Sequence, residues 1–320
     1  MKIVLLDTDS LGYDLDYTSF HSLGEVITYK HTPQEEIVKR CYDADVLISN
    51  KIHYTQEILF ALPNLKLICL TSTGTNTVDL SAADACGVCV SNIKGYSTQS
   101  VVLLTFAMLM YLLVPMSGYD DYVKRGSYIE DTKFSHYTMT WHELAGKTFG
   151  IVGLGAIGQE VAKIATTFGA RIIYYSTTGK NDHKEYRRVD FDTLLQESDI
   201  ISIHAPLTEA TTNLFDSAAF RKMRPTAILM NFGRGPIVNE KELVEALNEG
   251  WIFRAGLDVL EEEPMKLHHP MQRLKDKNKL IITPHIAWAS VESRNRMLNE
   301  VYQNIEAFFQ GKPRNKVNNT

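Results

Sequence analysis

Three side chains that can handle protons or anions follow predicted strands in the second half of the chain. Arg234 stands in the run NFGRG, Glu263 in DVLEEEP and His285 in TPHIAW. Reducing a 2-oxo acid requires an acid for the carbonyl oxygen, a cation for the carboxylate and a group that keeps the acid charged. Imidazole, guanidinium and carboxylate are side chains of these three kinds, so the trio is a candidate catalytic set once a hydride donor is bound.

A glycine-rich turn precedes this set and indicates what the hydride donor is. The run Gly153-Leu154-Gly155-Ala156-Ile157-Gly158 follows a predicted strand and opens a helix with apolar residues on one face. Gly153 permits a tight turn, Gly155 lets backbone amides reach a diphosphate, and Gly158 allows close helix-to-strand packing. The diphosphate then rests at the positive end of the helix. The turn therefore predicts a bound dinucleotide, and we expect a nicotinamide dinucleotide as the hydride donor.

The next strand bears on the choice between NAD and NADP. A carboxylate at its end usually binds the ribose 2′-hydroxyl, but Ser176 occupies that position and Lys180 follows closely. A hydroxyl would not repel a 2′-phosphate. We expect NAD, and NADP is not excluded.

The elements that would position these residues form two alternating series. Short β-branched runs alternate with helical patterns over the first 100 residues, and again from Lys147, which predicts two parallel sheets covered on both faces. We expect a substrate domain over residues 1–98 and 290–320 and a dinucleotide-binding domain over 99–289, with the cofactor between them. The predicted strands are Lys2–Asp7, Glu25–Tyr29, Asp45–Ser49, Leu65–Thr71, Val88–Ser91, Thr148–Val152, Arg171–Tyr175, Ile200–His204, Ala227–Asn231, Arg254–Asp258 and Leu280–Thr283.

The amino-acid composition argues against nucleic-acid binding, metal binding and membrane insertion. The chain is 44% hydrophobic and 22% charged with a formal charge of -5 and has no long basic run, which argues against a nucleic-acid partner. Its four cysteines suit a reducing cytoplasm, and Cys86-x-x-Cys89 has no companion ligands for zinc, so no metal is expected. The pair His268-His269 is expected to be an exposed loop. The apolar run 101–116 is short for a membrane span and predicts a buried helix.

Four ordered motifs together carry a resemblance. The Gly-Leu-Gly-x-Ile-Gly turn, Asn-x-Gly-Arg-Gly, Leu-Asp-Val-x-x-x-Glu-Pro and Thr-Pro-His resemble the D-isomer-specific 2-hydroxyacid dehydrogenases, most firmly from Leu65 to Trp288. Trp288 and Asn50-Lys51 look most like the glycerate dehydrogenase (hydroxypyruvate reductase) branch. The resemblance implies a Rossmann-type, doubly wound cofactor domain, a flavodoxin-like α/β substrate domain and a homodimer that meets near the segment after the long helix.

The resemblance also implies residue roles. His285 would be the general acid in reduction, Glu263 would hydrogen-bond it and favour its protonated form, and Arg234 would pair with the substrate carboxylate. Asp258 would bind the nicotinamide carboxamide. The implied cofactor residues are Gly153, Gly155, Ala156, Ile157, Gly158, Ser176, His204, Ala205, Pro206, Phe232, Gly233 and Asp258, and the implied substrate residues are Lys51, Thr73, Gly74, Arg234 and Trp288.

The expected activity is hydride transfer from NAD(P)H to hydroxypyruvate or glyoxylate, giving D-glycerate or glycolate. Two alternatives stay open. One is a dinucleotide-sensing interaction protein on the same scaffold, comparable to corepressors that resemble this family. The other is a dehydrogenase for larger 2-hydroxy acids. Leu103 stands where many relatives carry Glu or Gln, which argues against a polar role at that position.

Overall fold

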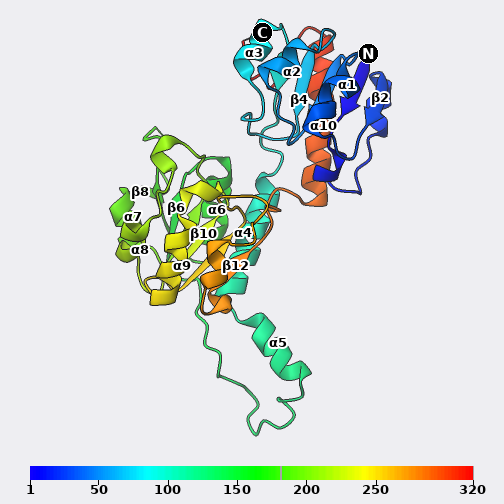
Figure 1. Ribbon diagram of the computed structural model, residues 1–320. Coiled ribbons are helices and arrows are strands. Elements are labelled where there is room, and N and C mark those ends of the chain that lie inside the picture. Colours follow the sequence, from blue (N-terminus) through cyan, green and yellow to red (C-terminus); the bar gives the residue numbers. More distant parts are fainter. Residues whose placement is uncertain (181, 320) are drawn as a thin grey trace. The chain divides into compact units, whose positions relative to one another are not determined.

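A computed structural model describes residues 1–180 and 182–319. The chain divides into two compact units (Figure 1). The first comprises Met1–Ser97 together with the chain from Trp288 onward, and the second comprises Thr98–Ala287.

The first unit is built on a five-stranded parallel sheet. Its strand order is β2-β1-β3-β4-β5, the flavodoxin-like order. Residues alternate along β1, so Val4 faces a core shared with α1, α2 and α3, while Ile3 and Leu5 face α10. The elements are β1 (Lys2–Leu5), β2 (Glu25–Thr28), α1 (Ile37–Cys41), β3 (Val46–Ser49), α2 (Gln56–Phe60), β4 (Leu67–Leu70), α3 (Leu80–Ala85), β5 (Cys89–Ser91) and α10 (Val291–Phe309).

The second unit is built on a seven-stranded parallel sheet of doubly wound order. The order β12-β11-β10-β9-β6-β7-β8 reverses direction between β6 and β9, which is where ligands bind in such folds. Helices α4 and α6 cover one face, and α7, α8 and α9 cover the other. The elements are α4 (Thr98–Leu113), α5 (Met116–Lys124), β6 (Thr148–Val152), α6 (Ala156–Thr167), β7 (Arg171–Tyr175), β8 (Arg187–Arg188), α7 (Phe191–Glu197), β9 (Ile200–Ile203), α8 (Ser217–Lys222), β10 (Ile228–Asn231), α9 (Glu240–Glu249), β11 (Arg254–Leu257) and β12 (Leu280–Ile282).

The predicted α/β class with two parallel sheets is confirmed, and two details differ. The sequence did not predict β8, which is only two residues long. The expectation that the helix over residues 101–116 is buried is wrong on one side, because Leu103 and Tyr111 of α4 are 69% and 53% exposed. No single helix in the described ranges is long and apolar enough to cross a membrane, although α4 and α5 would qualify together as a pair bent by 60°.

Candidate active site

The glycine-rich turn leaves β6 and opens α6 with little room for side chains. Gly153 has a φ of +89°, and a Cβ there would lie 2.9 Å from the Cα of Ala205. A Cβ at Gly158 would lie 2.3 Å from the carbonyl oxygen of Gly153. At Gly155, the N-cap of α6, a Cβ would meet nothing within 4 Å, so the backbone at this helix end is open to an anion. This arrangement fits a dinucleotide diphosphate.

A cavity of about 110 Å³ lies beside the turn. The Ser176 hydroxyl on its wall is buried and has no hydrogen-bond partner among the described residues, which leaves it for a ligand. Of the predicted cofactor residues, Ala205, Phe232 and Gly233 lie in the buried layer next to this cavity rather than on its wall, and Ala156 and Ile157 form the first turn of α6. The wall is formed by Gly153, Leu154, Gly155, Ser176, Thr177, Thr178, His204 and Pro206.

His204, directly after β9, is a neutral wall residue. Its ring stacks on Phe232 with centroids 5.9 Å apart, and its Nε2 shares a hydrogen bond of 2.8 Å with the Ser202 hydroxyl. Its Nδ1 is buried without a partner in the part of the chain that the structure describes. Burial lowers the pKa of His204 to about 3. The ring therefore offers hydrogen bonds to a ligand without carrying charge.

The structure brings His285 and Glu263 together. The Nδ1 of His285 lies 2.6 Å from the Oε2 of Glu263, and both side chains are about one-third exposed. The other carboxylate oxygen of Glu263 accepts a hydrogen bond of 2.9 Å from the backbone amide of Leu260. The carboxylate is thus fixed on one side and orients the imidazole on the other, which leaves the Nε2 of His285 for a reacting group.

Asp258 holds the loop that carries His285. This carboxylate is 2% exposed and accepts hydrogen bonds from the Thr283 hydroxyl at 2.6 Å and from the backbone amides of Ile286 and Ala287 at 3.0 and 2.9 Å. His285 itself has a φ of +55°, a left-handed conformation that non-glycine residues seldom adopt. Because Asp258 bonds to both sides of His285, it stabilises this conformation, a role that the sequence did not reveal.

Arg234 stands on a loop that packs against the Glu263 loop. The buried Asn231 side chain fixes the Arg234 loop by accepting from the amide of Gly233 and donating to the carbonyl of Arg234. A Cβ at Gly235 would lie only 1.8 Å from the carbonyl oxygen of Leu260, so the two loops touch backbone to backbone. The Arg234 side chain is exposed, and one guanidinium nitrogen donates to the carbonyl of Gly233 at 2.8 Å. Its other donors remain for an anion.

Comparison with known proteins agrees with this geometry. The profile of the D-isomer specific 2-hydroxyacid dehydrogenase NAD binding domain matches residues 106–287. A hydroxypyruvate reductase of Blautia hydrogenotrophica is 37% identical, covering 99% of this chain and 100% of that one, and a glycerate dehydrogenase of Methylorubrum extorquens is 36% identical, covering 99% and 98%. An acyclic imino acid reductase solved with NADPH and D-Arg matches with a TM-score of 0.86 and 28% identity, covering 99% and 100%.

The chain belongs to the D-isomer specific 2-hydroxyacid dehydrogenase family. It is an oxidoreductase with a domain that binds a nicotinamide dinucleotide, as its motifs predicted.

The predicted substrate residues of this dehydrogenase, apart from Arg234, lie in the first unit. The backbone amide of Lys51 donates to the buried Asp7 carboxylate at 2.7 Å, and its side chain is exposed. The Thr73 hydroxyl donates to the carbonyl of Ile93, and no hydrogen bond from the backbone amide of Gly74 is found among the described residues. Trp288 packs edge-on against Tyr96 with centroids 6.5 Å apart. Gly74 therefore has a donor to offer, and Trp288 contributes to the core of this unit.

The expectation that His268 and His269 are both exposed in a loop is correct for His268 and wrong for His269. His268 is exposed, but His269 is buried, and its Nε2 lies 2.7 Å from the Oε2 of the buried Glu240 at the start of α9. The amides of Glu240 and Glu261 each donate to the other residue's carboxylate, at 2.9 and 2.8 Å. This cluster anchors the base of the loop that carries Glu263. The sequence pattern missed it because the partners of His269 are far away in the chain.

Proposed function

We propose that this dehydrogenase reduces hydroxypyruvate or glyoxylate, forming D-glycerate or glycolate. The observation that carries the proposal is the 2.6 Å contact between His285 and Glu263, whose loop packs against the loop that bears Arg234. The names of the hydroxypyruvate reductase and the glycerate dehydrogenase, each matched over nearly its whole length, favour these small 2-oxo acids.

His285 is the proton donor of the proposed reaction. With Nδ1 engaged by Glu263, the Nε2 nitrogen donates its proton to the substrate carbonyl oxygen as the carbon accepts a hydride. The bound reduced dinucleotide supplies that hydride. The product is the hydroxy acid, and the neutral imidazole regains a proton from solvent before the next turnover. In the reverse direction the same nitrogen removes the hydroxyl proton.

Arg234 grips the substrate carboxylate. Its planar guanidinium can donate two parallel hydrogen bonds, which fixes the acid and polarises the adjacent carbonyl. We also propose that the Gly74 amide and the Thr73 loop bind the carboxylate and that Lys51 and Trp288 affect substrate choice. The Gly74 amide, which has no hydrogen-bond partner among the described residues, supports the first of these roles. In this scheme the unit from Thr98 to Ala287 is the cofactor domain and the other unit is the substrate domain.

A turnover assay tests the proposal. Purified protein is given hydroxypyruvate, glyoxylate, pyruvate and phenylpyruvate with NADH and NADPH in parallel. Hydroxypyruvate or glyoxylate is expected to give the highest kcat/KM, and His285→Ala should lower kcat by about 100- to 10,000-fold. A preference for phenylpyruvate would contradict the substrate assignment. Tight dinucleotide binding without turnover of any acid would indicate a sensing protein instead.

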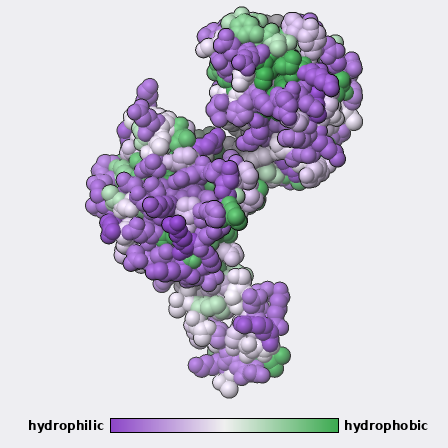
Figure 2. Space-filling view, in the orientation of Figure 1, coloured by the Kyte–Doolittle hydropathy of each residue, from purple (hydrophilic) through white to green (hydrophobic). Residues whose placement is uncertain are grey.

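The dehydrogenase is further proposed to act as a homodimer through the segment after α4, which comprises α5 and the chain up to residue 145. Figure 1 draws α5 and the chain after it extending from the second unit, and Figure 2 shows apolar side chains interrupting the hydrophilic surface of this extension. Ile129 and Phe134 are each 88% exposed, which is unusual for large apolar side chains outside an interface. Sedimentation equilibrium should give a dimer, and Phe134→Asp combined with Ile129→Asp should give monomers. A monomeric wild-type protein would contradict the proposed homodimer.

A reducing compartment such as the cytoplasm is the proposed location. The four cysteines are unpaired, and Cys41 and Cys69 are buried with pKa values that burial raises. Fractionation of cells, followed by detection of the protein, tests this location.

A further inference from the structure

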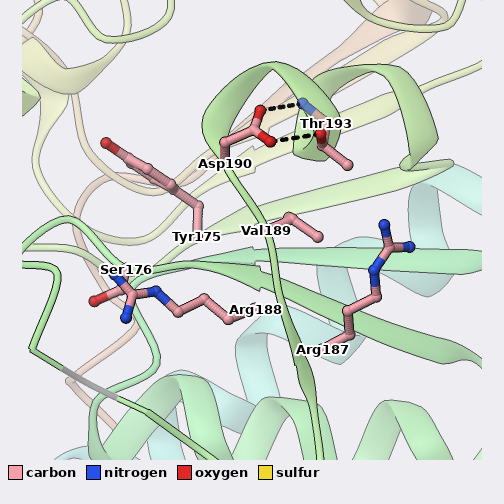
Figure 3. Close-up of a pocket in the computed structure, with 7 residues that line it drawn as sticks. All are labelled: Tyr175, Ser176, Arg187, Arg188, Val189, Asp190 and Thr193. Atoms are coloured by element: carbon pink, nitrogen blue, oxygen red, sulfur yellow. Dashed lines mark hydrogen bonds between the residues drawn. The ribbon is translucent and has the colours of Figure 1, made fainter.

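A second and larger cavity adjoins the dinucleotide site. It has a volume of about 580 Å³ and lies where β7 ends beside β8 and the start of α7 (Figure 3). Ser176 lines both this cavity and the smaller one beside the glycine turn, so it joins the two. In a dinucleotide fold the residue after this strand lies at the 2′-position of the adenosine ribose. The larger cavity is therefore on the 2′ side of a bound dinucleotide.

The side chains of the two arginines of β8 point in different directions. Successive side chains of a strand face opposite sides, and Figure 3 shows Arg188 reaching toward Ser176 while Arg187 extends away. Arg187 is already engaged by Glu197, with nitrogen-to-oxygen distances of 2.8 and 3.2 Å. The side chain of Arg188 makes no hydrogen bond or ion pair in the described part of the chain. A Cβ at Gly179 would lie 3.6 Å from one of its guanidinium nitrogens, which places the free cation over the loop after β7.

Among the described residues that line the cavity, no carboxylate bonds to Arg188. Asp190 is the one carboxylate among these described lining residues, and it caps α7 by accepting from the amide and hydroxyl of Thr193 at 2.9 and 2.7 Å. Figure 3 shows it turned toward Thr193 and away from Ser176. Ser176, Thr177 and Thr178 follow β7 in sequence and supply hydroxyls where an acid would bind an unphosphorylated ribose. Free positive charge and neutral hydroxyls suit a phosphate and do not suit selection of a 2′-hydroxyl.

We propose that this cavity binds the 2′-phosphate of NADPH, with Arg188 and the Ser176 hydroxyl as its contacts, and that the enzyme prefers NADPH to NADH. The inference rests on the dinucleotide site of the proposed function. Arg188 binds two phosphate oxygens through its planar fork, and the buried Ser176 hydroxyl, which has no partner among the described residues, gains one from the phosphate. The sequence favoured NAD without excluding NADP, and this proposal reverses that order.

Equilibrium binding to the purified protein, without substrate, tests the proposal. Nicotinamide fluorescence gives the Kd of NADPH and of NADH for the wild type, Arg188→Gln, Arg187→Gln and Ser176→Asp. NADPH should bind wild type at least about 10-fold more tightly than NADH, and Arg188→Gln should weaken NADPH by about 10- to 100-fold while changing NADH by less than about threefold. Arg187→Gln removes the same charge from the same strand, but Glu197 holds that side chain, so NADPH should weaken by less than about threefold.

Ser176→Asp provides the opposite perturbation. A carboxylate at this position accepts from a ribose 2′-hydroxyl and repels a 2′-phosphate, so the preference should move toward NADH by about 100-fold. Wild-type protein that binds NADH as tightly as NADPH would overturn the proposal, as would equal losses of NADPH affinity in Arg187→Gln and Arg188→Gln. Failure of wild-type protein to bind either nucleotide would instead overturn the proposed function, and this inference with it.

Discussion

A methyl group at Gly235 should separate the two loops that carry Arg234 and Glu263. In Gly235→Ala the new Cβ would lie 1.8 Å from the carbonyl oxygen and 1.9 Å from the carbonyl carbon of Leu260. Both atoms belong to the backbone, so no side-chain rotation can relieve the clash. Real Cβ contacts essentially never fall below 3.0 Å, so the loops must move apart by at least 3.0 − 1.8 = 1.2 Å.

That displacement acts on His285, the proposed proton donor, through a short chain of contacts. The Leu260 amide donates to Glu263 at 2.9 Å, and Glu263 in turn contacts His285 at 2.6 Å. A shift of 1.2 Å along the first bond would lengthen it to about 4.1 Å, beyond hydrogen-bond range. Displacement of catalytic groups by about 1 Å can cost about 100-fold in rate. We therefore expect kcat/KM to fall about 100-fold and the free energy of unfolding to fall by about 1–3 kcal/mol.

Steady-state reduction of hydroxypyruvate, urea unfolding and dinucleotide binding are measured on the same preparations. Gly250→Ala is the matched control, because Gly250 at the end of α9 has a φ of +72° and open surroundings. It should cost about 1–2 kcal/mol of stability without lowering kcat/KM, since it touches neither loop. If folded Gly235→Ala retains kcat/KM within about threefold of the wild type, loop contact does not position the catalytic groups, and the reasoning fails.

Three further outcomes follow from individual contacts. Glu263→Gln should lower kcat about 10- to 100-fold because it removes the negative charge next to His285. Glu262 is exposed and pairs with Lys266, so Glu262→Gln should leave kcat unchanged, and equal effects of the two variants would contradict this reasoning. Asp258→Asn should lower the free energy of unfolding in urea by about 1–3 kcal/mol and also lower kcat, because a hydrogen of the new amide would face a backbone N–H donor. An unchanged kcat would show that Asp258 does not position the His285 loop. The pKa of His204 falls from 6.5 to about 3 on folding, so between these pH values the unfolded chain protonates this imidazole and the folded chain does not. The free energy of unfolding should therefore drop as the pH falls from 6.5 toward 3, by at most about 1.4 kcal/mol per pH unit, and His204→Asn should flatten this slope.

The fold could be predicted because each sheet is parallel and buried on both faces. Such strands appear in the sequence as continuous apolar runs, and the helices between them have amphipathic spacing. The strand β8 has neither signal, because its two residues are both arginines and both exposed. The exposed face of α4 was missed for a related reason. Leu103 and Tyr111 are apolar, so hydropathy alone could not distinguish a core position from a free surface.

The site residues that belong to motifs could be predicted from the sequence, but the hydrogen bonds that hold them in place could not. The Gly-x-Gly-x-x-Gly turn and the residues after β10, β11 and β12 have fixed places at one edge of a parallel sheet. The bonds from Asp258 to the His285 loop join residues more than twenty positions apart, and no local pattern encodes them. Arg188 was missed because it lies in an unrecognised strand, and the direction of its side chain depends on register.

The active-site loops of the second unit form one connected structure rather than three separate positions. Asp258 fixes the His285 loop, Glu263 joins His285 to Leu260, and Leu260 touches Gly235 beside Arg234. A change at any link displaces the same groups, so losses in kcat should be much smaller in combination than their sum. Residues that act as a unit in catalysis are known to be non-additive in this way. This connection also explains why glycine stands at position 235: any larger residue there would disturb the proposed proton donor, His285, and the proposed carboxylate-binding Arg234 at once.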